Sequence, residues 1–138
     1  MVVSSFWLKK CDFCYINKKS NSYKDLLVWQ KSIDLVSCIY KLTEEFPKSE
    51  IYGLSSQMQR AAVAIPSNIA EGQRRAHKKE FIQFLHISYG SGAELETQLE
   101  ICKRLYKIEN SEYTDIVLNL EIIMKMLNSL ISSLKNSL

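Results

Sequence analysis

Hydrophobic side chains recur every three or four residues along most of the chain, which is the period of an amphipathic α-helix. The pattern predicts helices over about residues 24–45, 55–71, 78–107 and 112–136. Residues that end or begin helices separate these segments: Phe46-Pro47, Tyr52-Gly53, Gly72 and Asn110-Ser111. Because helices joined by short connections pack as antiparallel neighbours, we expect an all-α, up-down-up-down four-helix bundle over residues 23–138.

The first predicted helix carries more apolar residues than a single bundle core requires. They form two neighbouring series: Leu26, Trp29, Ile33, Val36 and Tyr40, and Val28, Leu35, Ile39, Leu42 and Phe46. The last predicted helix adds a second series in the same way, with Val117, Met124 and Ile131. One core cannot cover both series on each helix, so we expect the bundle to self-associate.

A proline interrupts the second predicted helix at Pro66. In a helix interior proline removes one backbone hydrogen bond and costs about 3 kcal/mol. We expect Asn68, Glu71 and Glu94 to hydrogen-bond backbone groups near it. Carboxylates that face a bundle interior can also form di-iron or proton-transfer sites. Such metal sites use Glu-x-x-His pairs, which neither histidine completes, so we favour the structural role and expect no cofactor.

Small residues are expected to bring the second and third helices close together. Ala61 and Ala62 of the second helix would approach Gly90 and Gly92 of the third. Each glycine in a helix interior costs up to about 1 kcal/mol relative to alanine, so a close crossing is the reason we expect for them. Gly72 is predicted to end the second helix in the left-handed conformation.

The net charge of +3 is confined to the first 22 residues. This segment carries four lysines and one aspartate: Lys9, Lys10, Lys18, Lys19 and Asp12. Residues 23–138 hold 14 basic and 14 acidic residues. We therefore expect residues 1–22 to be a flexible, basic extension of a neutral bundle domain.

No apolar run approaches the roughly 18 residues that a membrane span needs, and the order of apolar and basic residues at the start is the reverse of a secretory signal. We expect a cytoplasmic protein with no membrane partner and with reduced cysteines. Cys11 and Cys14 form a lone C-x-x-C pair without the second pair that zinc usually requires. Cys38 and Cys102 fit helical core positions.

Four basic residues cluster between the second and third helices: Arg74, Arg75, Lys78 and Lys79, with Arg60 earlier on the second helix. A bundle places this junction at one end, and a ring of subunits would repeat it around one rim. Clustered cations bind RNA phosphates by releasing counterions. A solvated turn between helices would carry the same charges without any ligand. Both interpretations remain open, and these residues are the candidate nucleic-acid-binding site.

Patterns typical of catalysis are absent from the sequence. It has no nucleophile elbow, no glycine-rich phosphate loop and no H-E-x-x-H motif. We therefore predict a protein that is not an enzyme.

Several segments together carry a family resemblance: residues 23–26, 29–31, 46–47, 50–54, 60–72, 79–81, 90–91 and 94–99. The most specific is residues 60–72, with the motif residues Pro66, Ser67, Asn68, Glu71 and Gly72, while Glu94 opens the last segment. These segments resemble the four-helix bundle proteins encoded in intervening sequences of bacterial 23S rRNA genes. The resemblance covers about residue 23 to the C-terminus, and residues 1–22 fall outside it.

The resemblance implies a left-handed four-helix bundle that assembles into a homopentameric ring, without an established activity. A related branch comprises the accessory variability proteins of diversity-generating retroelements, basic nucleic-acid-binding partners of a reverse transcriptase. The neutral bundle of this chain departs from that basic character. Our first hypothesis is a non-catalytic, RNA-binding oligomer linked to 23S rRNA intervening sequences. The alternative is a scaffold that recruits a protein partner, such as a reverse transcriptase.

Overall fold

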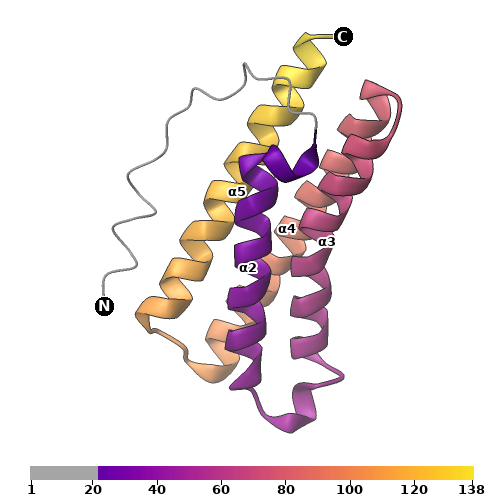
Figure 1. Ribbon diagram of the computed structural model, residues 1–138. Coiled ribbons are helices and arrows are strands. Elements are labelled where there is room, and N and C mark those ends of the chain that lie inside the picture. Colours follow the sequence, from indigo (N-terminus) through magenta and orange to yellow (C-terminus); the bar gives the residue numbers. More distant parts are fainter. Residues whose placement is uncertain (1–21) are drawn as a thin grey trace.

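The computed structural model describes residues 22–138, and this part of the chain is a four-helix bundle without strands (Figure 1). The helices are α2 (Leu27–Glu44), α3 (Leu54–Arg74), α4 (Lys78–Tyr106) and α5 (Ser111–Asn136), with two 3-10 turns, η2 (Tyr23–Asp25) and η3 (Lys48–Glu50). The all-α prediction is confirmed, and each helix starts and ends within three residues of its predicted bounds. Residues 1–21, with most of the predicted basic extension and the Cys11–Cys14 pair, lie outside the described residues.

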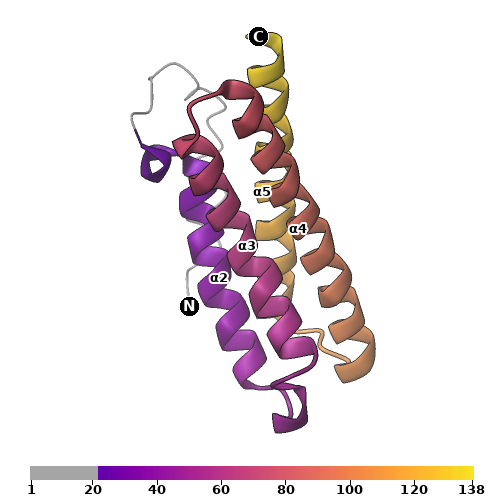
Figure 2. The same ribbon diagram turned by 90° about the vertical axis from the view of Figure 1, so that its right-hand side faces the viewer.

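Each helix packs against two others: α3 lies between α2 and α4, and α5 contacts both α4 and α2. Successive helices run in opposite directions (Figures 1 and 2). The end of the bundle that holds η2, the α3–α4 connection and the last turn of α5 is here called the upper end (Figure 1). The lower end holds η3 and the α4–α5 connection. Every functional candidate considered below is therefore located by its distance along a helix from one of these ends.

The core contains the first-choice apolar series of each helix. In α2 these are Val28, Leu35, Ile39 and Leu42, all buried. The second series of α2 remains outside the core, where Ile33 is 40% exposed and Tyr40 is 43% exposed. In α5, Ile131 of the second predicted series is buried, while Val117 and Met124 are half-buried beside α4. The predicted surplus of apolar surface is thus present, chiefly on α2.

The backbone of α3 stays helical through Pro66, which is buried. Two side chains bind carbonyl groups in this turn. Asn68 Nδ2 donates to the carbonyl oxygen of Ala64 at 2.7 Å, and Ser88 Oγ of α4 donates to the carbonyl oxygen of Ile65 at 2.9 Å. The second bond crosses between helices in the buried interior, so it fixes the position of α4 along α3 at the proline.

Glu71 and Glu94 do not reach the proline turn, so the role predicted for them is wrong. Both carboxylates lie on the exposed outer surface of their helices. Glu71 forms an ion pair with Arg75 one turn later, and Glu94 accepts a 3.3 Å hydrogen bond from Gln98. The sequence could not separate the inner from the outer side here because the apolar residues of α4 occupy both.

Two glycine predictions also need correction. Gly72 is not left-handed and does not end α3, which continues to Arg74. A Cβ atom at Gly72 would lie 2.5 Å from Cβ of Phe84, so this glycine allows α3 and α4 to touch. Gly92 instead faces Met124 of α5, and Gly90 faces open space. The close crossing of α3 and α4 therefore exists, but at Gly72 and Ser88 rather than at Gly90 and Gly92.

Glu50 fastens the lower end. Its Oε2 atom accepts a 2.8 Å hydrogen bond from the backbone N–H of Leu54 and so caps the start of α3. Its Oε1 atom accepts a 2.8 Å hydrogen bond from the hydroxyl of Tyr106 at the end of α4. The ring of Tyr106 also lies 5.0 Å from that of Phe46, between ring centroids. One carboxylate thus joins the α2–α3 connection to α4.

Among the described residues, only α5 is long and apolar enough to cross a membrane by length and composition. A core helix of a bundle passes the same test, so this is weak evidence for a membrane span. In the bundle one side of α5 faces the core, through Ile116, Leu120, Ile123, Leu127 and Ile131. The other side keeps apolar surface exposed, with Leu118 at 49%.

Candidate nucleic-acid interface

Four of the five candidate binding residues gather at the upper end of the bundle. Arg74 is the last residue of α3, Arg75 follows it, and Lys78 and Lys79 begin α4. All four side chains are exposed. The three-residue connection between the helices forces these charges together, because it leaves the end of α3 directly beside the start of α4.

Arg60 does not belong to this cluster. It lies on α3, 14 residues before Arg74, which corresponds to roughly 21 Å along the helix axis at 1.5 Å per residue. Its side chain is exposed near the lower end. Sequence proximity to the motif in residues 60–72 suggested a shared site, and the helix rise separates the two.

The structure adds two lysines that the sequence reasoning missed, Lys24 in η2 and Lys135 in the last turn of α5. Both lie at the upper end, since Lys78 contacts Ser137 beyond α5 and Arg74 contacts Tyr23 of η2. The number of helices could have revealed them. In an antiparallel bundle of four helices, the start of the first, the junction of the second and third, and the end of the fourth all meet at one end.

The neighbours of these cations differ, and so does their availability to a ligand. Lys78 Nζ donates to the carbonyl oxygen and to Oγ of Ser137, at 2.9 and 3.0 Å, and neutralises the carbonyl end of α5. Arg75 pairs with Glu71 at 2.8 Å, with both side chains about half exposed, so the pair adds little stability. In residues 22–138, Lys79 and Arg74 form no ion pair. These two keep their full charge toward solvent.

Aromatic rings support both arginines of the cluster. The guanidinium carbon of Arg74 lies 5.4 Å from the ring centroid of Tyr23, and that of Arg75 lies 5.1 Å from the ring centroid of Phe84. The Tyr23 ring in turn packs edge-on against Trp29 at 5.3 Å. Contacts of this kind hold the guanidinium groups in place and leave their outer faces open.

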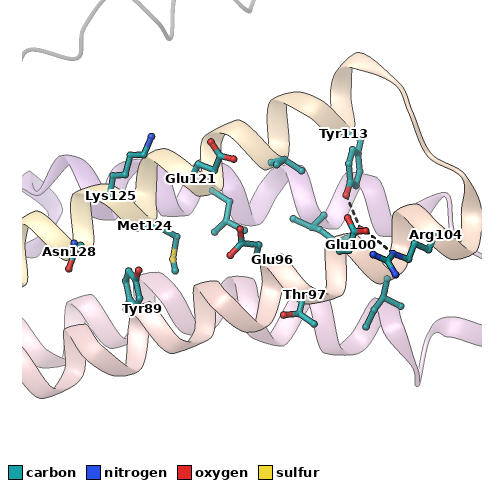
Figure 3. A pocket seen from close by; sticks show the side chains of 14 residues that line it. Tyr89, Glu96, Thr97, Glu100, Arg104, Tyr113, Glu121, Met124, Lys125 and Asn128 are labelled. Atoms are coloured by element: carbon teal, nitrogen blue, oxygen red, sulfur yellow. Dashed lines mark hydrogen bonds and ion pairs between the residues drawn. The ribbon is translucent and has the colours of Figure 1, made fainter.

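A second surface feature is a groove of about 790 Å³ between α4 and α5 (Figure 3). Its apolar part includes Tyr89, Ile101, Val117, Leu120 and Met124. Its charged part is mixed, with Glu96, Glu100, Arg104, Glu121 and Lys125. At its lower end the hydroxyl of Tyr113 donates to the carbonyl oxygen of Leu99 at 2.9 Å. The shape and apolar floor suit a protein helix better than a phosphate group.

Neither feature presents the groups of a catalytic or metal site. Within the described residues, no three His, Cys, Asp or Glu side chains are placed to hold a metal ion. Burial raises the pKa of the Cys102 thiol to about 11, and burial is also the main cause that raises the pKa of Cys38. Both thiols are therefore protonated and weakly nucleophilic at neutral pH. Cys102 is fully buried as predicted, whereas Cys38 is only half-buried.

Comparison with known proteins agrees with the resemblance. Residues 24–129 match the model of the family described as 23S rRNA-intervening sequence protein. A solved structure described as a protein with unknown function from the S23 ribosomal protein family, from Bacteroides thetaiotaomicron VPI-5482, is 29% identical, with a TM-score of 0.67. The similarity covers 76% of this chain and 98% of that one. A comparison with curated proteins gives no significant match. The family model covers well over half of the chain, and the chain therefore belongs to the 23S rRNA-intervening sequence protein family.

Proposed function

We propose that this protein is a non-catalytic RNA-binding protein whose upper end contacts the phosphate backbone of RNA. The observation that carries the proposal is the gathering of six cations at that end: Lys24, Arg74, Arg75, Lys78, Lys79 and Lys135. The nearby carboxylates are fewer, namely Asp25, Glu71 and Glu80. A bundle that is neutral as a whole is thus locally positive where phosphates would bind.

The experiment is binding of the purified full chain to a labelled, structured 23S rRNA fragment across a salt series. Replacing Arg74, Arg75, Lys78 and Lys79 together by alanine should weaken binding and flatten the dependence of affinity on salt. Each phosphate contact contributes close to one unit to the slope of log K against log salt concentration. The slope therefore reports how many of these cations touch phosphate.

A matched control removes four cations from the lower end: Lys48, Lys103, Arg104 and Lys107. It changes the net charge by the same amount, so general attraction between protein and RNA falls equally in both variants. The proposal requires a larger loss for the upper-end variant. Equal losses would reduce the cluster to a solvated turn, and unchanged binding in both would remove the RNA-binding role.

We also propose, in line with the family resemblance, that the up-down-up-down bundle is left-handed and assembles into a homopentameric ring. Its support is the apolar surface that one copy leaves uncovered. The stripe of α2, formed by Trp29, Ile33, Val36 and Tyr40, has the spacing of a helix that docks in a groove. The α4–α5 groove offers an apolar floor of matching kind, on helices that the stripe does not itself cover.

A stripe on one copy and a groove on the next form a head-to-tail contact, because the two surfaces differ. Such contacts close into rings when the rotation between copies allows it. A ring would repeat the basic upper end in several copies on one rim and so strengthen a weak attraction to RNA. If the apolar surfaces instead hold a reverse transcriptase or another protein, that binding will vary little with salt, which separates the alternative from RNA binding.

A further inference from the structure

Phosphate attraction does not explain why both arginines of the upper end lie on aromatic rings. A phosphate group attracts any exposed cation, and Lys79 provides one without support. Arg74 and Arg75, by contrast, are each placed against a ring, at 5.4 Å from Tyr23 and 5.1 Å from Phe84. The upper end therefore combines two kinds of cation, mobile lysines and arginines with a fixed plane.

A fixed guanidinium plane has a use that a lysine cannot fulfil. Its outer face can stack on a nucleobase, as aromatic rings do in proteins that bind single-stranded RNA. Packing holds these planes before any ligand arrives: Tyr23 is itself packed against Trp29, and Arg75 is also held by Glu71 at 2.8 Å. Ordering side chains in advance lowers the entropic cost of binding. The Arg75 side chain stays 46% exposed, so its outer side is open to solvent.

We propose that the Arg74–Tyr23 and Arg75–Phe84 pairs form a stacking platform for unpaired bases of single-stranded RNA. The exposed lysines Lys24, Lys79 and Lys135 bind phosphates on either side of those bases. Bases inside a duplex already stack on each other and cannot reach the platform, so the ligand is a single strand or a loop rather than a helix. This inference rests on the proposed RNA-binding function and narrows its ligand class.

The test keeps the charge of the platform and removes its plane. The variant Arg74→Lys with Arg75→Lys is compared with wild type on three probes: a 12-nucleotide single strand, the duplex of the same sequence, and an abasic single strand of the same length. Stacking of one base is worth about tenfold in affinity or more. We expect the variant to bind the single strand about tenfold more weakly, with binding to the duplex and abasic probes unchanged.

Two further variants guard against trivial explanations. Arg60→Lys with Arg104→Lys makes the same chemical change at arginines that lie over no ring in the described part of the chain, and should leave all three affinities unchanged. Tyr23→Leu removes the ring under Arg74 and should lower single-strand affinity, while Tyr23→Phe should retain it. Circular dichroism of each variant establishes that the helices are intact.

The outcomes separate this inference from the function on which it rests. If wild type binds the abasic and base-containing strands equally, and the lysine variant binds like wild type, the platform does not exist. The RNA-binding role would then still stand if alanine substitution of the four clustered cations weakens binding. If those alanine substitutions have no effect either, both the inference and the proposed function fail.

Discussion

Glycines at three positions of the bundle face three different surroundings, which gives them different roles. Gly72 touches the side chains of Phe84 and Phe81, Gly92 faces the flexible side chain of Met124, and Gly90 has no atom within 4 Å of where a Cβ would stand. Only the first packs against a Cβ atom, which cannot rotate away. The helix propensity of alanine is the same at all three, so differences between substitutions report packing alone.

We predict that Gly72→Ala destabilises the protein by about 1–3 kcal/mol, the usual cost of overpacking a close contact. The added methyl group would stand 2.5 Å from Cβ of Phe84 and 3.0 Å from Cδ2 of Phe81, so α3 and α4 must move apart. Urea denaturation monitored by circular dichroism measures the change. The control Gly90→Ala should stabilise by about 0.5–1 kcal/mol, because it adds helix propensity without a contact. Equal effects of the two substitutions would contradict a close crossing at Gly72.

Single residues also mark where sequence reasoning reaches its limit. The buried series of α3 followed directly from its period of three and four, and Met58, Ala61, Ala62, Ile65 and Ile69 are all buried as predicted. Gly72 was mistaken for a helix end because its neighbour across the interface, Phe84, is 12 residues away in sequence. Ser88 was included in the glycine-rich stretch for its size, although its hydroxyl is what binds the carbonyl of Ile65. Contacts between helices are not visible in the pattern of one helix.

At the level of the elements, the lower connection depends on the charge state of Glu50. The backbone N–H of Leu54 first, and the Tyr106 hydroxyl second, hold the pKa of the Glu50 carboxyl below its usual range. The folded state thus binds the carboxylate better than the acid. The resulting stabilisation is fully present above the unfolded pKa of about 4.3 and is lost as pH falls through the lower, folded value.

We predict that Glu50→Gln lowers the free energy of unfolding at pH 7 and that its difference from wild type shrinks below about pH 4.3. The amide can still accept hydrogen bonds but carries no charge, so it keeps the shape of the connection. Unfolding in urea at several pH values measures the difference. Tyr106→Phe removes the second cause only and should retain part of the pH dependence. A gap that does not change with pH would show that the charge of Glu50 is not involved.

The order and bounds of the elements were predictable, whereas the composition of the upper-end site was only partly so. The α3–α4 junction brings Arg74, Arg75, Lys78 and Lys79 together through the chain itself, which the sequence reveals directly. Lys24 and Lys135 join them only because four antiparallel helices return the chain to the same end. Arg60 was grouped wrongly because closeness in sequence along a rigid helix still separates residues by 1.5 Å at each step.

For the whole molecule, the main unpaired features are the α2 stripe and the α4–α5 groove. Each offers one isoleucine and one tyrosine at similar exposure: Ile33 at 40% and Tyr40 at 43% in the stripe, Ile101 at 42% and Tyr89 at 39% in the groove. This match permits a symmetric test, since the same pair of side chains can be charged on either surface. Partly exposed positions also accept glutamate without unfolding the core.

We predict that Ile33→Glu with Tyr40→Glu, and separately Tyr89→Glu with Ile101→Glu, each convert a ring into monomers. Light scattering coupled to size-exclusion chromatography measures the mass. Mixed together, the two variants should form a dimer and nothing larger, because only the intact stripe of one and the intact groove of the other can meet. Charging Ile87 and Leu105, which are exposed on α4 outside the groove, should leave the assembly unchanged. If stripes instead pair with stripes, the groove variant will keep its assembly and the mixture will form no dimer, which would replace the head-to-tail ring with a two-fold contact. RNA binding by the two monomeric variants would then be compared with wild type: weaker binding with an unchanged salt slope for each copy would indicate that the ring acts by repeating the upper end, and not by completing it.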